Sequence, residues 1–281
     1  MAKVDWAEIP QEDFRVPKVA PLSDMTAELT ELLGHSDPRL REEIAVPVLR
    51  TWIARGVYDD LLAGLGDGIA TGLAQGLGER GTDSVFRRSS SAVVLADCLV
   101  RDIRQPLVAP AKIVHWGDRV ATWLLAERDL RGYVPGKGWA RAVAHGADAL
   151  GTFANSAHCG PAEMPVVLDV IGERVTADVD QVWSAGEADR LAAATVQVLR
   201  RDLVALDDVE DWAMRIGKRA LGATTQRRRP EPAAVNADLF LRALYLQLAL
   251  GPEPPPTRAD LVLTLVSMLR ELHPEILGPP R

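Results

Sequence analysis

Residues 127–153, ERDLRGYVPGKGWARAVAHGADALGTF, combine turn-forming residues, aromatic side chains and charged groups in one short segment. Gly132 is expected to end the helix before it, because glycine adopts the left-handed conformation at a helix C-terminus without steric cost. Pro135 fixes one torsion of a tight turn and Gly136 supplies the positive one. A second helix is predicted over residues 139–153. The segment therefore predicts two helices joined by a short turn, and the rest of the chain reads as amphipathic helix.

The second predicted helix has an apolar side and a polar side. At about 100° per residue, one side collects Trp139, Ala142, Val143, Gly146, Leu150 and Phe153. Arg141, His145 and Asp148 fall on the opposite side, within reach of one another. A carboxylate stabilises a protonated histidine, and such a pair is the usual minimum for general acid–base catalysis. His145 and Asp148 are therefore the candidate catalytic residues, and a solvated ion cluster is the alternative interpretation.

Other side chains of the segment are candidates for ligand binding: Glu127, Arg131, Tyr133, Lys137, Trp139 and Arg141. Tyrosine and tryptophan offer contact area with a polar tip, and lysine and arginine suit an anionic group. Trp139 fits the core equally well, because it lies on the apolar side. We predict no metal site, since one histidine beside an arginine is a poor cation ligand set.

The sequence resembles a bacterial family described as domain of unknown function 2785 (DUF2785). Three stretches carry the resemblance: SVFRRSSSAVVLADCLVRD, RGYVPGKGWARAVAHGADAL and VLDVIGERVTADVDQVWSAGEADRLAAA, within residues 37–221. The positions that match the central motif are Arg131, Gly132, Tyr133, Gly136, Lys137, Gly138, Trp139, His145, Ala147 and Asp148. The resemblance implies an all-helical fold and a shared central site, and it assigns no chemistry. Family members often carry a second histidine where this chain has Arg141, which puts a two-histidine site in doubt here.

The composition also favours a helical protein. Hydrophobic residues make up 47% of the 281 residues and aromatic residues only 5%, so the chain is globular and poor in strand-forming side chains. Helix start and stop signals delimit about eleven helices with short connections. We therefore predict an all-α fold, an irregular antiparallel array of the HEAT-like or α-solenoid kind.

Prolines and charges suggest the domain boundaries. Residues 1–22 are predicted to form an irregular arm and residues 23–281 a single helical domain. Asp37 followed by Pro38 predicts a helix start, and Pro47 is expected to kink or divide that helix. Residues 224–234 resemble a linker before the last two helices, and the three arginines within them are interpreted as solvated.

Charge and cysteine content limit the partners. The net charge of −7 and the pI near 5.3 argue against general nucleic-acid binding, which needs a basic face. The sequence shows no uninterrupted apolar run of membrane-spanning length and no signal peptide, so no membrane partner is expected. Two cysteines without metal-binding spacing fit a reducing, cytoplasmic location. The GLGDG stretch at residues 64–68 lacks the GK[ST] of a phosphate-binding loop, and no cofactor is predicted.

Three functional hypotheses remain open. The favoured one is a binding or scaffold protein with a groove at the central motif for a protein partner or for a small molecule, for which the lysine and arginine side chains would suit an anionic group. The alternative is a small-molecule enzyme of hydrolase or lyase type, in which His145 and Asp148 form the acid–base pair and Arg131, Lys137 or Arg141 stabilises an oxyanion. In the third hypothesis the motif only fixes the geometry between two helices.

Overall fold

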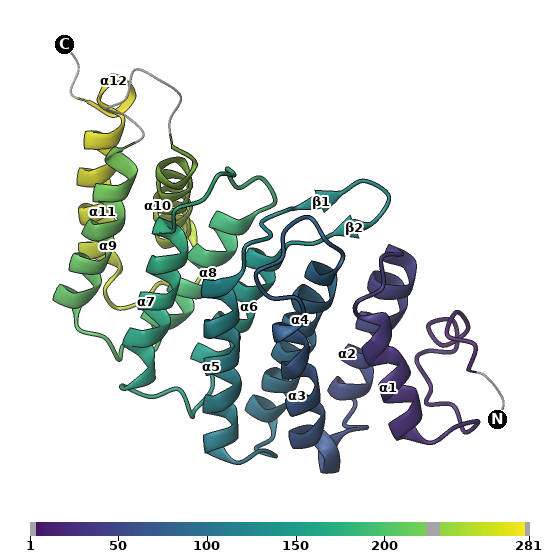
Figure 1. Ribbon diagram of the computed structural model, residues 1–281. Coiled ribbons are helices and arrows are strands. Elements are labelled where there is room, and N and C mark those ends of the chain that lie inside the picture. The colour runs from purple at the N-terminus through teal and green to yellow at the C-terminus, as the bar shows by residue number, and fades with distance from the viewer. Residues whose placement is uncertain (1–3, 223–230, 279–281) are drawn as a thin grey trace. The chain divides into compact units, whose positions relative to one another are not determined.

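The computed structural model describes residues 4–222 and 231–278 (Figure 1). The described residues contain twelve α-helices, short 3₁₀ and π segments and one two-stranded hairpin, which confirms the predicted all-α class. The chain divides into two compact units, Met1–Ala149 and Leu150–Arg281. The HEAT-like arrangement and the single domain from residue 23 stay predictions. Of the predicted linker, residues 224–230 with the three arginines lie outside the described residues.

The first unit begins with an arm that packs against the helices. Residues 4–21 form turns and bends, and α1 (Leu22–Leu32) follows. The Trp6 side chain is buried, and its ring centroid lies 6.4 Å from that of Trp52. The indole N–H of Trp52 donates a hydrogen bond of 2.8 Å to the carbonyl of Phe14. The described part of the arm has no regular secondary structure, and the buried Trp6 side chain attaches it to the helices through apolar contact.

The helix predicted to start at Asp37-Pro38 is divided at Pro47. The Asp37 carboxylate accepts the backbone N–H of Arg39 at 2.9 Å and so satisfies a donor at the helix start. A π-helical segment, η1 (Arg39–Ala45), precedes α2 (Val46–Ala54). Pro47 lies in the first turn of α2, where its missing N–H costs least.

The glycine-rich stretch forms a short helix that packs closely on its neighbour. The 3₁₀ segment η2 (Asp59–Leu61) leads into α3 (Leu62–Thr71), and the 3₁₀ segment η3 (Gly72–Ala74) follows. A Cβ atom on Gly66 would lie 2.1 Å from Cζ2 of Trp116 in α5 (Pro110–Ala126). Only a glycine allows this close approach, and the contact compensates for the low helix propensity of the stretch.

Helix α4 (Ser84–Arg104) occupies the centre of the first unit. It packs against α2, α3 and α5, as Figure 1 shows, and most of its first fifteen residues are buried. Among these buried residues are the polar side chains Arg87, Arg88 and Ser89. Polar groups in such a position need internal partners, and these partners connect α4 to the central motif.

The central motif forms a β-hairpin before its helix. Strands β1 (Tyr133–Val134) and β2 (Gly138–Trp139) pair antiparallel, and α6 (Ala142–Ala154) follows. The predicted turn is confirmed: the N–H of Lys137 donates to the carbonyl of Val134 at 2.9 Å, and Gly136 has a φ of +74°. The predicted helix start at Trp139 is wrong by three residues, because Arg141 has a φ of +50° that no α-helix accommodates.

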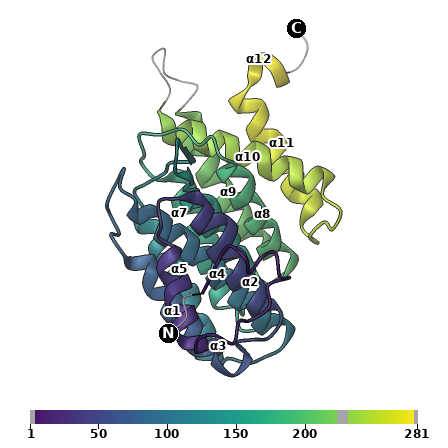
Figure 2. The same ribbon diagram turned by 90° about the vertical axis from the view of Figure 1, so that its right-hand side faces the viewer.

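The second unit contains α7 (Glu163–Thr176), α8 (Glu187–Arg200), α9 (Leu206–Leu221), α10 (Pro232–Leu250), α11 (Arg258–Leu272) and α12 (Pro274–Leu277). Helix α10 packs against α7, α8, α9 and α11 (Figure 2). Among the described helices, α10 alone has the length and apolar composition to cross a membrane, and 56% of that stretch is buried. A core helix of a soluble protein meets the same criterion, so this finding is weak evidence for a membrane span.

Candidate functional site

Glu127 follows α5 and forms a buried ion pair with Arg88 of α4. Neither side chain has any solvent exposure. The carboxylate accepts the Arg88 Nε–H at 2.6 Å and an Nη2–H at 2.9 Å, and the Trp123 indole N–H donates to it at 2.9 Å. It also accepts the backbone N–H groups of Arg128 and Asp129. The carboxylate predicted to contact a ligand therefore joins α4 to the chain that enters the hairpin.

Arg131 forms an ion pair with Asp129 beside the hairpin. Its Nη2 lies 2.7 Å from a carboxylate oxygen of Asp129, and it donates a second hydrogen bond of 2.6 Å to the carbonyl of Thr82. Hydrogen bonding to Asp129 raises the pKa of Arg131, despite partial burial. The backbone N–H of Gly81 also donates to Asp129, at 2.9 Å. These contacts connect residues 79–83 to the hairpin.

The hairpin is fastened at Lys137 and Trp139. The Lys137 ammonium lies 2.7 Å from both carboxylate oxygens of Asp83, and the Lys137 carbonyl accepts a hydrogen bond of 2.5 Å from the buried Arg41. Glu42 accepts the backbone N–H of Trp139 at 3.0 Å. A Cβ atom on Gly138, whose φ is +80°, would lie 2.5 Å from Glu42 Oε1. Glycine is therefore required at this position.

Two aromatic rings and one guanidinium lie together at the surface of the hairpin. Tyr133 is 59% exposed and Trp139 is 37% exposed, and their ring centroids are 5.2 Å apart in an edge-to-face arrangement. The guanidinium carbon of Arg141 lies 3.6 Å from the centroid of the Trp139 ring. Arg141 Nε is buried and has no hydrogen-bond partner among the described residues. We call Tyr133, Trp139 and Arg141 the aromatic–arginine stack.

His145 and Asp148 lie one turn apart on α6 and are partly exposed. From Ala142 to Leu150 they are the residues of this helix that are not fully buried. These two residues thus share one side of the helix, as periodicity indicated. Arg141 does not join them, because it precedes the helix and stacks on Trp139. The alternative that Trp139 belongs to the core is not what the structure shows.

Ser89 is a partner of His145 that the sequence did not indicate. Its Oγ lies 2.7 Å from His145 Nδ1 and also hydrogen-bonds the carbonyl of Ala140. A carbonyl cannot donate, so the single hydroxyl proton goes to Ala140 and the proton of the shared bond comes from Nδ1. The neutral His145 ring then carries its lone pair on Nε2. Ser89 is only 1% exposed, and it lies 56 positions from His145 in the chain, so no local pattern reveals the contact.

The two cysteines are buried and unsuited to act as nucleophiles. Both Cys98 and Cys159 have no solvent exposure. Burial raises the pKa of the Cys159 thiol to about 11 and shifts the pKa of Cys98 upward as well. Thiols in this state are protonated near neutral pH and react slowly. In the described part of the chain, no group of three His, Cys, Asp or Glu side chains is placed to hold a metal ion.

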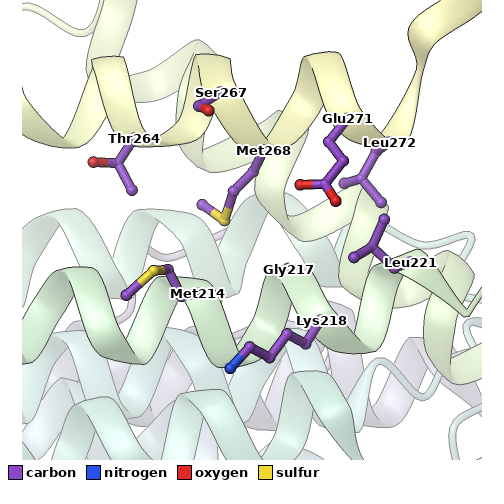
Figure 3. Close-up of a pocket in the computed structure, with 9 residues that line it drawn as sticks. All are labelled: Met214, Gly217, Lys218, Leu221, Thr264, Ser267, Met268, Glu271 and Leu272. Carbon is purple, nitrogen blue, oxygen red and sulfur yellow. The ribbon is translucent and has the colours of Figure 1, made fainter.

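A separate cavity lies between α9 and α11 of the second unit. Its volume is about 460 Å³, and Figure 3 shows its lining side chains, among them Met214 and Met268 from the two facing helices. Lys218 and Glu271 also line it. None of the residues of the central motif contributes to this cavity, so it is not part of the candidate site.

Comparison with known proteins identifies the family and no activity. No curated protein and no solved structure matches the chain. One family model, described as a protein of unknown function (DUF2785), matches residues 73–246, which include α4, the hairpin and α6. The match covers more than half of the chain and agrees with the resemblance seen in the motif. The chain therefore belongs to the DUF2785 family of proteins of unknown function.

Proposed function

We propose that this protein is a binding or scaffold protein whose recognition surface is the aromatic–arginine stack. The observation that carries this proposal is the exposure of Tyr133 and Trp139 together with the guanidinium of Arg141 stacked on the indole. Tyrosine, tryptophan and arginine are the residue types most enriched among the side chains that dominate binding energy at protein interfaces.

The anchoring of the hairpin supports this function. Arg41, Glu42 and Asp83 fix the backbone and the Lys137 side chain of the hairpin, while the pair between Glu127 and Arg88 fixes the chain before it. Surface groups held in this way lose little conformational freedom on binding, and affinity rises accordingly. In this proposal the charged residues of the motif hold the hairpin in place, and the stack forms most of the binding surface.

The stack favours a partner with an acidic group beside an apolar side chain. A guanidinium that lies flat on an aromatic ring keeps its in-plane donors available, and their geometry suits a carboxylate or phosphate. Arg141 Nε itself is buried, so a surface partner would be bound through the other donors of the guanidinium. The exposed edges of the two rings supply the apolar contact.

Acid–base chemistry at His145 is the second candidate function. The hydrogen bond to Ser89 favours it, because it fixes the Nδ1–H tautomer and makes Nε2 the acceptor of the neutral ring. A serine nucleophile is disfavoured, since the Ser89 hydroxyl is buried and donates to a carbonyl. This function would be established if the protein turns over a substrate and His145→Gln abolishes that turnover while partner binding stays intact.

Site-specific photo-crosslinking tests the binding function. A photoreactive phenylalanine replaces exposed Pro135 at the hairpin tip in the full chain, in cells that express it. The same residue at Ile103, which is 41% exposed, serves as control. Ile103 lies near the opposite end of α4, about 28 Å from Ser84 at a rise of roughly 1.5 Å per residue.

We expect one adduct of defined mass at position 135 and none at position 103. Trp139→Ala and Arg141→Met should each remove the adduct without changing the helical circular dichroism, because both side chains lie partly at the surface. An adduct that forms equally at both positions, or that survives both substitutions, would contradict the proposal. Absence of any adduct at position 135 would contradict it as well.

A further inference from the structure

A groove of about 600 Å³ lies between α1 and α3 in the first unit. It contains none of the motif residues from Glu127 to Asp148. Its lining combines hydroxyl groups, carboxylates, small residues of α3 and one arginine from α4. The lining residues that bear on the argument are Glu28, Glu31, Gly64, Gly68, Thr30 and Arg87.

Arg87 is a buried cation without a counter-ion in this groove. Its side chain is 7% exposed, and Nη1 donates a hydrogen bond to the carbonyl of Thr30. Nε is buried without a hydrogen-bond partner, and no carboxylate of the described residues lies within ion-pair distance of the guanidinium. Burial lowers the pKa of Arg87, and the nearby Glu31 opposes this shift. A buried guanidinium with an unpaired Nε–H and no carboxylate partner is costly unless a ligand supplies the missing acceptor.

Two carboxylates line the same groove from α1. Glu28 and Glu31 lie one turn apart at exposed positions, and neither forms an ion pair in the described part of the chain. The groove therefore presents a positive group and two negative groups that do not pair with one another. Such an arrangement is complementary to a ligand that carries both charges.

The α3 side of the groove is kept open by glycine. A Cβ atom on Gly64 or Gly68 would meet no other atom within 4 Å. Gly66 on the same helix behaves differently, since its Cβ would collide with Trp116. Close helix packing thus explains why residue 66 is a glycine. The glycines at positions 64 and 68 instead leave open space at the groove.

We propose that the α1–α3 groove binds a small zwitterion, a molecule with one carboxylate and one ammonium group such as a free amino acid or a short peptide. The ligand carboxylate accepts hydrogen bonds from the Arg87 guanidinium, and the ammonium donates to Glu28 or Glu31. Charge-assisted hydrogen bonds of this kind are stronger than neutral ones. This site is independent of the aromatic–arginine stack.

Calorimetric titration of the full chain with matched compounds tests the charge requirement. The common L-amino acids and the dipeptide Gly-Gly are screened at millimolar concentration near pH 7. The best ligand is then compared with its N-acetyl form, which lacks the ammonium, and with its amide, which lacks the carboxylate. We expect each single-charge form to bind at least about tenfold more weakly, because each loses charge-assisted hydrogen bonds. The proposal is overturned if no zwitterion binds, or if a single-charge form binds equally well.

Two variants locate the binding in this groove. Gly68→Leu fills the open space and improves the helix propensity of α3, so the protein should fold while binding falls at least about tenfold. Arg87→Met removes the buried charge and should abolish binding. Ala111→Leu, at an exposed position of α5 outside the groove, is the matched control and should bind like the wild type. Binding that survives Gly68→Leu, or that falls equally in Ala111→Leu, refutes the site.

Discussion

Replacement of Glu127 by glutamine tests the buried ion pair most directly. The substitution keeps the shape of the side chain and removes the negative charge that faces Arg88. The guanidinium would remain fully buried, held by the carbonyls of Gln75 and Gly76 at 2.9 and 2.8 Å and by the Ser84 hydroxyl at 2.8 Å. These neutral acceptors satisfy Nη1, whereas Nε and Nη2 now bond to the carboxylate. The variant therefore contains an uncompensated charge in the core.

The expected loss of stability follows from these contacts. Breaking a buried pair by removing one partner costs about 3–5 kcal/mol. The two hydrogen bonds to Arg88, at roughly 1.5–3 kcal/mol each, give a similar sum. Domains are stable by only about 5–15 kcal/mol, so Glu127→Gln should cost the first unit a large part of its stability.

Urea denaturation followed by circular dichroism, with hydrogen exchange of the α4 amides as a local probe, measures this loss. Asp169→Asn is the matched control, since Asp169 pairs with Arg215 at 3.3 Å and both side chains are about 60% exposed (63% and 60%). Exposed pairs contribute about 0–1 kcal/mol. A Glu127→Gln variant within about 1 kcal/mol of the wild type would refute the reasoning. So would an equal loss in the control.

Two further predictions concern packing and pH. Gly66→Ala should lower the free energy of unfolding by about 1–3 kcal/mol, because the added Cβ would lie 2.1 Å from Trp116. Gly64→Ala should raise it by up to about 1 kcal/mol, because alanine has the higher helix propensity. Equal melting temperatures for the two variants would contradict this prediction. Burial raises the pKa of Tyr58 from 10.0 to about 12 and also raises that of Cys98, so these groups ionise first in the unfolded chain. Their contribution to stability is complete below the unfolded pKa values and is lost as pH rises through alkaline values, with a slope of up to about 1.4 kcal/mol per pH unit for each group. Tyr58→Phe should reduce the slope measured above pH 10 by urea denaturation, and an unchanged slope would count against the burial argument.

Local chemistry made several features of the fold predictable. The turn at Pro135 and Gly136, the helix start at Asp37 and the division of that helix near Pro47 agree with the structure. Each of these depends on residues that are neighbours in the chain, so propensity and spacing suffice to predict it.

The helix start after the hairpin was not predictable in the same way. Periodicity placed Trp139 on the apolar side of a helix. In the structure, Arg141 has a positive φ, so α6 begins only at Ala142 and Trp139 belongs to β2. Strands of two residues show no alternation that a sequence pattern could reveal. The hydrogen bond from Trp139 N–H to Glu42, on a segment far away in the chain, helps to hold this conformation.

By itself the sequence determined the helical class, the family and the segment in which charged and aromatic groups concentrate. The tertiary structure decided what those groups do: Glu127 and Lys137 pair with Arg88 and Asp83, while Tyr133 and Trp139 are left at the surface. The physical reason is that helix and turn signals act between residues a few positions apart. Ion pairs, buried hydrogen bonds and exposure depend on segments tens of residues apart, and only folding brings these together.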